Sequence, residues 1–295
     1  MKFLDEMKVD SNSTWLDLAT SCRKENVDDL VEIENELLDR YDEYDDLIEN
    51  YLDDLDDSEF TDNKDLLKEY YEKPPAGLKK LILERRNDHE LLECPFCGNP
   101  RSPDTLDHFI PKDNWPEFSI HPNNLVPQCR GCAPTKGEKY YCDEDEKAIF
   151  VHPIYSDILS KFKFRIVVEF SIQTKKPTFS LKIMKPRGLD NPSGDRVVKH
   201  LRALKLNQRV MDFCNREFTK WKNKLKNKNF DIRIALNHRI HEREDSEQSK
   251  NWKTSLYLGM LDNNDLIDYL NSLSTTENTD TEEFEEFEEF EELEL

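Results

Sequence analysis

The pattern of apolar and polar residues predicts helices in the first part of the chain. Over residues 14–72, apolar side chains recur mostly at spacings of three and four, with acidic residues between them. This period matches one face of an α-helix, so we expect several amphipathic helices. The Pro74-Pro75 pair ends the region because a residue before proline disfavours the helical conformation. Residues 77–86 then predict one short helix.

A different pattern follows in the second half of the chain. Residues 162–170 and 178–184 alternate apolar and polar side chains around a short polar turn, which predicts a β-hairpin. The helical period returns over residues 195–226, and a final pair of helices is expected at 231–243 and 250–273. The predicted fold class is therefore α+β, mainly helical, with a β-hairpin and C-terminal helices.

Charge is distributed unevenly along the chain. The net charge is −21, but residues 1–75 carry 25 acidic and 8 basic residues, and residues 275–295 carry 11 acidic residues and no basic ones. Residues 76–274 hold 27 acidic and 34 basic residues and are net positive. Because net charge bears on partners rather than on fold, we expect the acidic ends and the basic middle to have different partners.

Together the two patterns predict four regions. They are an acidic helical region at 1–75, a cysteine-containing module at 76–150, a hairpin and basic helical region at 151–273, and an acidic tail at 274–295. The tail places an apolar residue at every third position between glutamate pairs, a spacing that drifts around a helix. Its composition favours disorder. The alternative is that it docks on a basic surface of this chain or of a partner.

Basic residues are concentrated in one predicted helical segment. From Arg196 to Lys228 the chain has eleven bases and two acids. Two interpretations have similar weight. The segment contacts a nucleic-acid backbone through sequence-independent charge pairs, or it is a solvated helix face.

The sequence favours a cytoplasmic protein. It contains no run of eighteen or more apolar residues, so we expect no membrane-spanning segment. Its first residues lack the apolar core and cleavage site of a signal peptide. The seven cysteines are an odd number, which argues against the disulfide framework of an exported protein.

Four of the cysteines form two CxxC pairs, Cys94/Cys97 and Cys129/Cys132. Each pair can aim two thiolates at one point, and two pairs complete the tetrahedral coordination that zinc favours. We therefore predict a closed, structural Zn²⁺ site without an open position for catalysis. The alternative is four unconnected buried cysteines. The 31 residues between the pairs must form an ordered excursion, and they contain a second motif.

That insertion carries Asp107-His108, with Pro111 shortly after, and then Asn123-Asn124 a few residues before the second cysteine pair. The order of these motifs, framed by the two CxxC pairs, resembles the zinc-ribbon branch of the HNH endonucleases, also called ββα-metal or His-Me finger nucleases. The resemblance implies a small ββα-metal nuclease module that hydrolyses phosphodiester bonds, with DNA as the expected substrate. The later segments, namely the stretch His152-Pro153-Ile154-Tyr155, the hairpin and the helical tail with Asn251-Trp252, resemble a bacterial subgroup of the family. Such proteins often work beside an ATPase in defence against phage, which implies an ATPase subunit as a protein partner.

The resemblance assigns roles by position. His108 would be the general base that takes a proton from the attacking water, a task that suits a neutral imidazole. Asp107 would bind a catalytic Mg²⁺ or Mn²⁺, which stabilises charge on the phosphate and on the leaving oxygen. Asn124 would brace the loop that fixes the His108 ring. The basic side chains expected to meet backbone phosphates are Lys112, Arg130, Lys136 and Lys139.

One position departs from the family pattern. In this family the residue after the last cysteine is usually His or Asn and binds the catalytic metal, whereas this chain has Ala133, whose methyl group cannot ligate a metal. Three interpretations follow. An engineered substitution has inactivated the chain, which we favour because the rest of the motif is intact. Alternatively, the protein naturally binds without cutting, or a neighbouring polar side chain fills the gap. The nearest such side chains are Asp104, His121 and Asn123.

The sequence is therefore compatible with three functions. The expected one is a metal-dependent endonuclease. The alternative is a catalytically inactive HNH-fold subunit that binds nucleic acid or a protein partner, and the residue at position 133 separates these two. The third is a zinc-stapled adaptor that never meets nucleic acid, which would make the basic middle region and the Asp107-His108 pair incidental.

Overall fold

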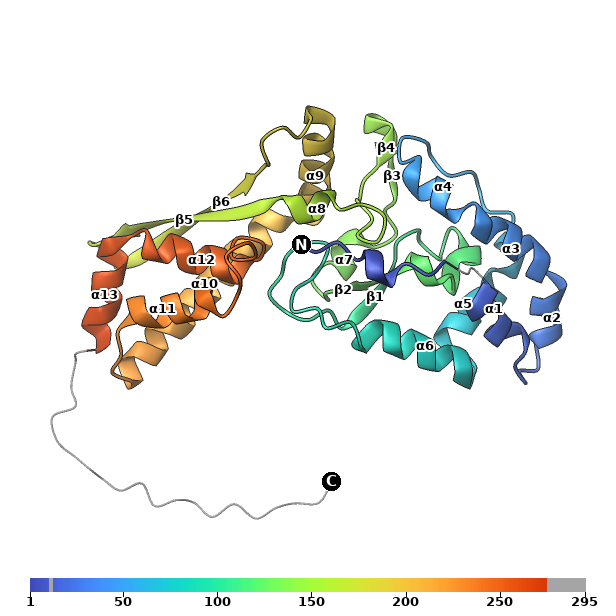
Figure 1. The fold of residues 1–295 in the computed structure, drawn as a ribbon, viewed down its shortest axis with the longest axis horizontal. Helices are drawn as coiled ribbons and strands as arrows, with labels where there is room; N and C mark the ends of the chain where they lie inside the picture. Colours follow the sequence, from blue (N-terminus) through green and yellow to red (C-terminus); the bar gives the residue numbers. More distant parts are fainter. Residues whose placement is uncertain (11–12, 275–295) are drawn as a thin grey trace, which may run out of the picture.

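The computed structural model describes residues 1–10 and 13–274 (Figure 1). Helices dominate, and the strands of the described residues form three two-stranded antiparallel sheets. The architecture is α+β, which confirms the predicted fold class at this level. Residues 275–295, for which we predicted a disordered or docking tail, lie outside the described residues.

Short helices make up the first part of the chain, as the apolar period predicts. They are α1 (Ser13–Thr20), α2 (Val27–Glu32), α3 (Glu34–Asp42), α4 (Tyr44–Glu49), α5 (Lys64–Glu72) and α6 (Ala76–Asn87). The predicted helical region also included residues 50–60, which are not helical. Leu52 follows the apolar spacing but lies in the turn after α4, where it is 58% exposed.

The buried faces of α3 and α4 show why the acidic helices fold onto the middle of the chain. Leu37, Tyr41, Tyr44 and Ile48 are buried, and their spacings of four, three and four place them on one side of the two helices. The Tyr44 ring packs edge-on against Phe118, with the ring centroids 5.1 Å apart. The acidic helices therefore cover the insertion between the two cysteine pairs.

The insertion itself forms a small hairpin, and a one-turn helix follows the second cysteine pair. These elements are β1 (Thr105–His108), β2 (Leu125–Gln128) and α7 (Ala133–Lys136). Strand β1 ends at His108, which pairs with Leu125 of β2. Pro111 accepts backbone hydrogen bonds from Asn114 and Trp115, so the chain turns just after the Asp107-His108 pair. A second small sheet follows, made of β3 (Tyr141–Cys142) and β4 (Lys147–Ala148).

The predicted β-hairpin is confirmed and consists of β5 (Lys163–Ser171) and β6 (Lys176–Met184). Phe164, Ile166 and Val168 alternate along β5 and are buried. They face α12 (Trp252–Leu261). The helix approaches the strand so closely that a Cβ at Gly259 would lie 2.0 Å from the carbonyl oxygen of Ile166, and only glycine fits there.

Two predicted C-terminal helices are interrupted in the structure. The helices of this part are α8 (Ile158–Lys161), α9 (Asn191–Ala203), α10 (Leu206–Asn227), α11 (Ile232–His241), α12 and α13 (Asn264–Ser274). The helix predicted over 195–226 breaks at Lys205, which has a φ of +51°, a conformation that interrupts a right-handed helix. The helix predicted over 250–273 is divided into α12 and α13. The break occurs at Asn263, whose side chain accepts from the backbone N–H of Leu266 at 2.9 Å and so starts a new helix.

The three parts of the chain are packed together. In Figure 1, α1–α6 lie on one side of the β1–β2–α7 segment, and β5–β6 with α10–α13 lie on the other. The amino group of Met1 donates to the carbonyl oxygen of Lys250 at 2.7 Å, which joins the amino terminus to the loop before α12. None of the described helices has the length and apolar character needed to cross a membrane.

Candidate functional site

The four cysteines of the two CxxC pairs meet in one buried cluster. The sulfur atoms of Cys94, Cys97, Cys129 and Cys132 all lie within 4.8 Å of one another, and those of Cys97 and Cys129 are 3.8 Å apart. Zinc–sulfur bonds of about 2.3 Å place the corners of a tetrahedron about 3.8 Å apart. The cluster therefore has the composition and dimensions to bind a metal such as zinc, which agrees with the predicted site.

The backbone of the knuckles aims these thiols inward. The N–H of Gly98 donates to the carbonyl oxygen of Cys94 at 2.9 Å, and the N–H of Cys132 donates to that of Cys129 at 2.8 Å. Gly98 has a φ of +71°, and a Cβ there would lie 2.5 Å from the Phe164 ring. The glycine is required both by this turn and by the close approach of β5, so the hairpin holds the first knuckle in place.

Arg209 of α10 covers the cysteine cluster. Its guanidinium donates to the sulfur of Cys132 at 3.3 Å and to those of Cys97 and Cys129 at 3.5 Å each. Burial acts to lower the pKa of Arg209, but the charges of Cys97 and Cys132 outweigh it and raise the pKa above its usual value. A guanidinium in this position favours deprotonated thiolates, the form that binds a metal.

His108, at the end of β1, is held as a neutral imidazole. Its Nε2 lies 3.0 Å from the carbonyl oxygen of Ser119. A carbonyl only accepts, so Nε2 carries the proton and Nδ1 keeps its lone pair. Burial lowers the pKa of His108 to about 3. The ring of Tyr71 packs edge-on against it, with the centroids 4.3 Å apart, and this fixes the plane of the imidazole.

Asp107 faces a buried lysine. Its carboxylate lies 3.2 Å from the ammonium of Lys136, which has no exposed surface. Burial raises the pKa of Asp107 to about 6, although Lys136 acts in the opposite direction. The same ammonium donates to the carbonyl oxygens of His108 and Phe109, both at 3.0 Å. Lys136 thus ties α7 to the end of β1, and an ammonium enclosed in this way is not placed to meet a phosphate as we had expected.

Asn124 is fully buried and holds the segment that follows His108. Its side-chain oxygen accepts from the N–H of Ile110 at 2.7 Å and from the hydroxyl of Tyr44 at 2.9 Å. Its amide donates to the carbonyl oxygens of Ile110 at 2.9 Å and Phe118 at 3.0 Å. These four hydrogen bonds fix the backbone two residues beyond His108, so Asn124 occupies a bracing position.

The three other side chains that we predicted to contact phosphate differ in how strongly the protein itself engages them. Lys112 pairs with Glu72 at 3.0 Å, and Arg130 pairs with Asp104 at 2.7 Å, although both of the latter side chains are exposed. Lys139 is exposed, and its ammonium donates only weakly to a carbonyl oxygen of α7, at 3.4 Å. Of the three, Lys139 offers the ammonium that is least engaged by the protein.

Some bases of the predicted basic segment are engaged inside the protein. Arg196 stacks on the Tyr51 ring at 3.5 Å, Lys199 pairs with Asp145 at 2.8 Å, and Arg209 covers the cysteines. These three are therefore removed from the nucleic-acid surface that we predicted. The bases that remain exposed are Arg202, Lys205, Arg216, Lys220, Lys224, Lys226 and Lys228.

None of the three side chains considered as substitutes for a ligand at Ala133 is placed for that role. Asn123 is hydrogen-bonded to the backbone of Val9, accepting at 2.9 Å and donating at 3.0 Å. His121 is buried beside the rings of Tyr41 and Tyr44, 4.7 and 4.4 Å from its own ring centroid. Asp104 pairs with Arg130 as described above. We therefore do not retain the gap-filling interpretation.

The residues present do not complete a second metal site. Asp107 supplies one carboxylate, Ala133 supplies no ligand atom, and the neighbouring cation is Lys136. Across the described residues, the four cysteines are the one group of three or more His, Cys, Asp or Glu side chains placed to share an ion. A catalytic Mg²⁺ or Mn²⁺ therefore does not fit this chain as it stands.

The structure adds residues around His108 that the sequence motif did not indicate. Tyr71 comes from α5, and burial raises the pKa of its hydroxyl against the opposing charge of Arg86 of α6. Within the described chain, the Arg86 Nε is buried without a hydrogen-bond partner. No local spacing links these positions to His108, because they come from helices outside the insertion. The same holds for Arg209, which lies 77 residues beyond Cys132.

Comparison with known proteins gives one local similarity. A stretch of 62 residues is 47% identical to the protein ea31 of Escherichia phage lambda, and it spans 21% of this chain and 20% of that protein. The shared segment is thus about a fifth of either chain. No family model matches the sequence, and no solved structure matches it.

Proposed function

We propose that this chain carries an HNH-type nuclease centre at Asp107 and His108 for the hydrolysis of nucleic-acid phosphodiester bonds, with DNA as the expected substrate. The observation that carries the proposal is the order of the elements. Strand β1 ends in Asp107 and His108, β2 pairs with it, and α7 follows beside the four-cysteine cluster. In this proposal the cluster holds Zn²⁺ and has a structural role.

His108 is suited to accept a proton from water. Its Nε2–H is held by the Ser119 carbonyl, so Nδ1 is the basic nitrogen. A pKa of about 3 makes a weak base in the free protein, but a phosphate anion beside the ring would favour imidazolium and raise that pKa. A divalent ion would stabilise charge on the phosphate only in a variant that supplies a second protein ligand. Asn124 and Tyr71 would keep the ring in place during proton transfer.

Position 133 decides whether that ion can bind. Residues 133 and 136 are three apart in α7 and therefore lie on the same side of the helix. Lys136 reaches Asp107 from that side. A longer side chain at position 133 would point toward the same carboxylate, so Asn or His there would supply the second protein ligand. We propose that Ala133 leaves the centre inactive in this chain.

A second candidate function is supported by the ion pair between Lys136 and Asp107. An internal ammonium already compensates the carboxylate, so the fold needs no divalent ion at this place. A subunit that keeps the HNH fold to bind nucleic acid or a protein partner, without cutting, would have these features. An ATPase partner and a cytoplasmic location remain predictions in either case.

Plasmid cleavage with Mn²⁺ tests the proposal. The chain is compared with its Ala133→Asn and Ala133→His variants, and with Ala133→Asn combined with His108→Ala. We expect no cutting by the original chain, cutting by at least one single variant, and loss of that cutting in the combined variant. Metal-replete, folded single variants that never cut would contradict the nuclease proposal and favour the binding subunit.

A further inference from the structure

A pocket outside the Asp107–His108 centre is lined by basic side chains. It encloses about 560 Å³ between α10, the start of α12 and the loop after the first cysteine knuckle. We call it the α10 pocket. Its basic side chains are Arg101, Arg209, Arg216, Lys220 and Lys253. Its acidic ones are Asp212 and Glu217, so positive charge dominates.

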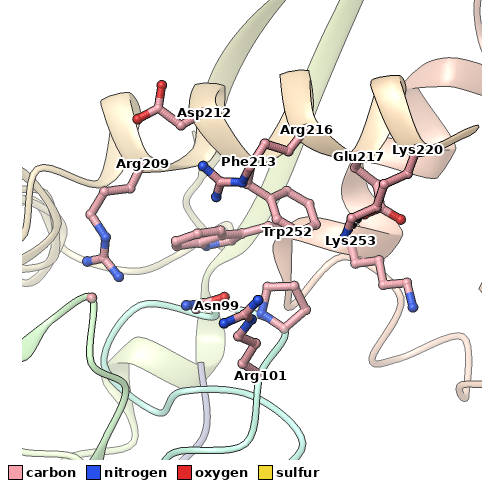
Figure 2. Close-up of a pocket in the computed structure, with 12 residues that line it drawn as sticks. Asn99, Arg101, Arg209, Asp212, Phe213, Arg216, Glu217, Lys220, Trp252 and Lys253 are labelled. Carbon is pink, nitrogen blue, oxygen red and sulfur yellow. Dashed lines mark hydrogen bonds and ion pairs between the residues drawn. The ribbon is translucent and has the colours of Figure 1, made fainter. Parts of the chain in front are cut away.

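The bases of the α10 pocket are not all neutralised within the protein. Arg209 is committed to the cysteine cluster, and Lys220 pairs with Glu217 at 3.3 Å. Arg101 and Arg216 are exposed and form no ion pair with the described residues. Figure 2 shows them on opposite walls, Arg216 on α10 and Arg101 on the loop below. Two free guanidinium groups facing one space match an anion with several acceptor oxygens.

The floor of the pocket is fixed by the cysteine cluster. Trp252 lies between the two walls (Figure 2) and donates through its indole N–H to the carbonyl oxygen of Cys97 at 2.6 Å. The Arg209 guanidinium lies 5.4 Å from the Trp252 ring centroid. Arg209, the Trp252 indole and the first knuckle therefore form one rigid unit. The loop that carries Arg101 follows this knuckle, so it is held in position before any ligand binds.

From these observations we propose that the α10 pocket binds phosphate groups of a nucleic-acid strand, as a second contact separate from the Asp107–His108 centre. A pocket of this volume would also accept a free nucleotide. The strand is favoured because the positive charge continues beyond the pocket, along exposed lysines of α10 and its end. These are Lys220, Lys224, Lys226 and Lys228. The inference rests on the proposed function, since it takes a nucleic acid as the ligand.

The test is binding of fluorescent single-stranded and duplex oligonucleotides by anisotropy, over a series of salt concentrations. The Arg101→Ala/Arg216→Ala variant removes two exposed charges from the α10 pocket. Its matched control, Lys176→Ala/Lys182→Ala, removes two exposed charges from β6. We expect the pocket variant to lose about tenfold or more in affinity at low salt and the salt slope to fall by about 2, as for two lost phosphate contacts. The control should change affinity less than twofold.

Several results would overturn the inference. Equal losses in the two variants would mean that general charge, not the pocket, binds the strand. Binding of AMP or ATP that needs both arginines, without oligonucleotide binding, would assign the pocket to a free nucleotide. No binding of either probe would also contradict it. Placing the Arg101→Ala/Arg216→Ala changes in the Ala133→Asn background separates the two proposals. Cutting unaffected by the pocket changes refutes the pocket alone, and pocket-dependent binding without cutting refutes the nuclease alone.

Discussion

The cysteine cluster and the Asp107–His108 centre lie on the same short stretch of chain but differ in completeness. The cluster has four cysteine sulfur atoms within 4.8 Å of one another and an arginine that offsets part of their charge. The Asp107–His108 centre has one carboxylate, and its nearest cation is Lys136 of the protein itself. The same fold therefore holds one group of side chains that is placed to share a metal ion and one that is not.

The difference shows that two parts of one motif can be maintained by different forces. The cysteine cluster holds the β1–β2 hairpin, α7 and α10 together, so loss of one of its cysteines affects folding. The other centre is held by hydrogen bonds of Asn124 and Lys136 and by the ring contact between Tyr71 and His108. None of these contacts needs a catalytic metal. A change of side chain at position 133 can therefore alter the Asp107–His108 centre while leaving the fold unchanged.

The largest expected effect is a loss of stability when one cysteine of the cluster is removed. Cys97→Ser removes one thiolate of the proposed Zn²⁺ site. Structural zinc sites contribute on the order of 10 kcal/mol, comparable to the whole stability of a domain. We expect loss of bound zinc and of cooperative thermal unfolding. Cys142→Ser, a change at a partly exposed cysteine outside the cluster, is the control and should retain both. A metal-free Cys97→Ser variant with an unchanged melting temperature would contradict the structural role.

The second largest effect is expected from removing the Lys136 ammonium at the Asp107–His108 centre, which should lower the free energy of unfolding. Lys136→Met leaves the Asp107 carboxylate buried without its partner, and breaking such a pair costs about 3–5 kcal/mol. We expect this loss in urea unfolding at pH 8. Adding Asp107→Asn to the same variant should recover part of it, since no charge is then left unpaired. If the double variant is less stable than Lys136→Met alone, the ion pair is not what holds α7 to β1.

Asn124→Ala tests the brace at a somewhat smaller cost. It removes the partners of the Ile110 N–H and C=O in the interior and the side-chain oxygen to which the Tyr44 hydroxyl donates, which costs about 3 kcal/mol in total. Asn237→Ala, which removes one hydrogen bond on the surface of α11, is the matched control and should cost under about 1 kcal/mol. Equal losses in urea unfolding would show that Asn124 braces nothing.

The smallest predicted effect is a pH dependence that belongs to Asp107. Its pKa is raised from 3.8 to about 6 in the folded chain, so the folded state holds this proton more tightly than the unfolded state. The stabilisation is present below pH 4 and is lost as the pH rises through 6. The free energy of unfolding of Asp107→Asn, measured relative to that of the original chain, should therefore rise by about 2 kcal/mol between pH 4 and pH 7. Parallel urea stability profiles would refute the raised pKa, and Asp212→Asn serves as an exposed control.

Local patterns in the sequence predicted the elements that depend on local interactions. The apolar period anticipated the face of Tyr41 and Tyr44, the alternation anticipated the β5–β6 hairpin, and the cysteine spacing anticipated the cluster. Each of these signals is contained within a short window of sequence. The interruptions at Lys205 and Asn263 were missed because single residues there override a continuous apolar period.

The candidate site was only partly predictable, because much of it comes from distant parts of the chain. The motif located Asp107 and His108, but nothing near them in sequence indicates Tyr71 on the ring or Arg209 on the thiols. The burial of Lys136 was also missed. A lysine beside a knuckle is usually exposed, and its enclosure depends on how α7 packs against β1.

Metal binding by the intact chain tests most directly the claim that one site is complete and the other is not. Zinc content is measured by elemental analysis, and Mn²⁺ binding by calorimetry, for the chain and for Ala133→Asn. We predict tightly bound zinc in both proteins, with specific Mn²⁺ binding in Ala133→Asn that is lost when Asp107→Ala is added. Specific, Asp107-dependent Mn²⁺ binding by the unaltered chain would contradict the account, as would the absence of zinc from a folded protein.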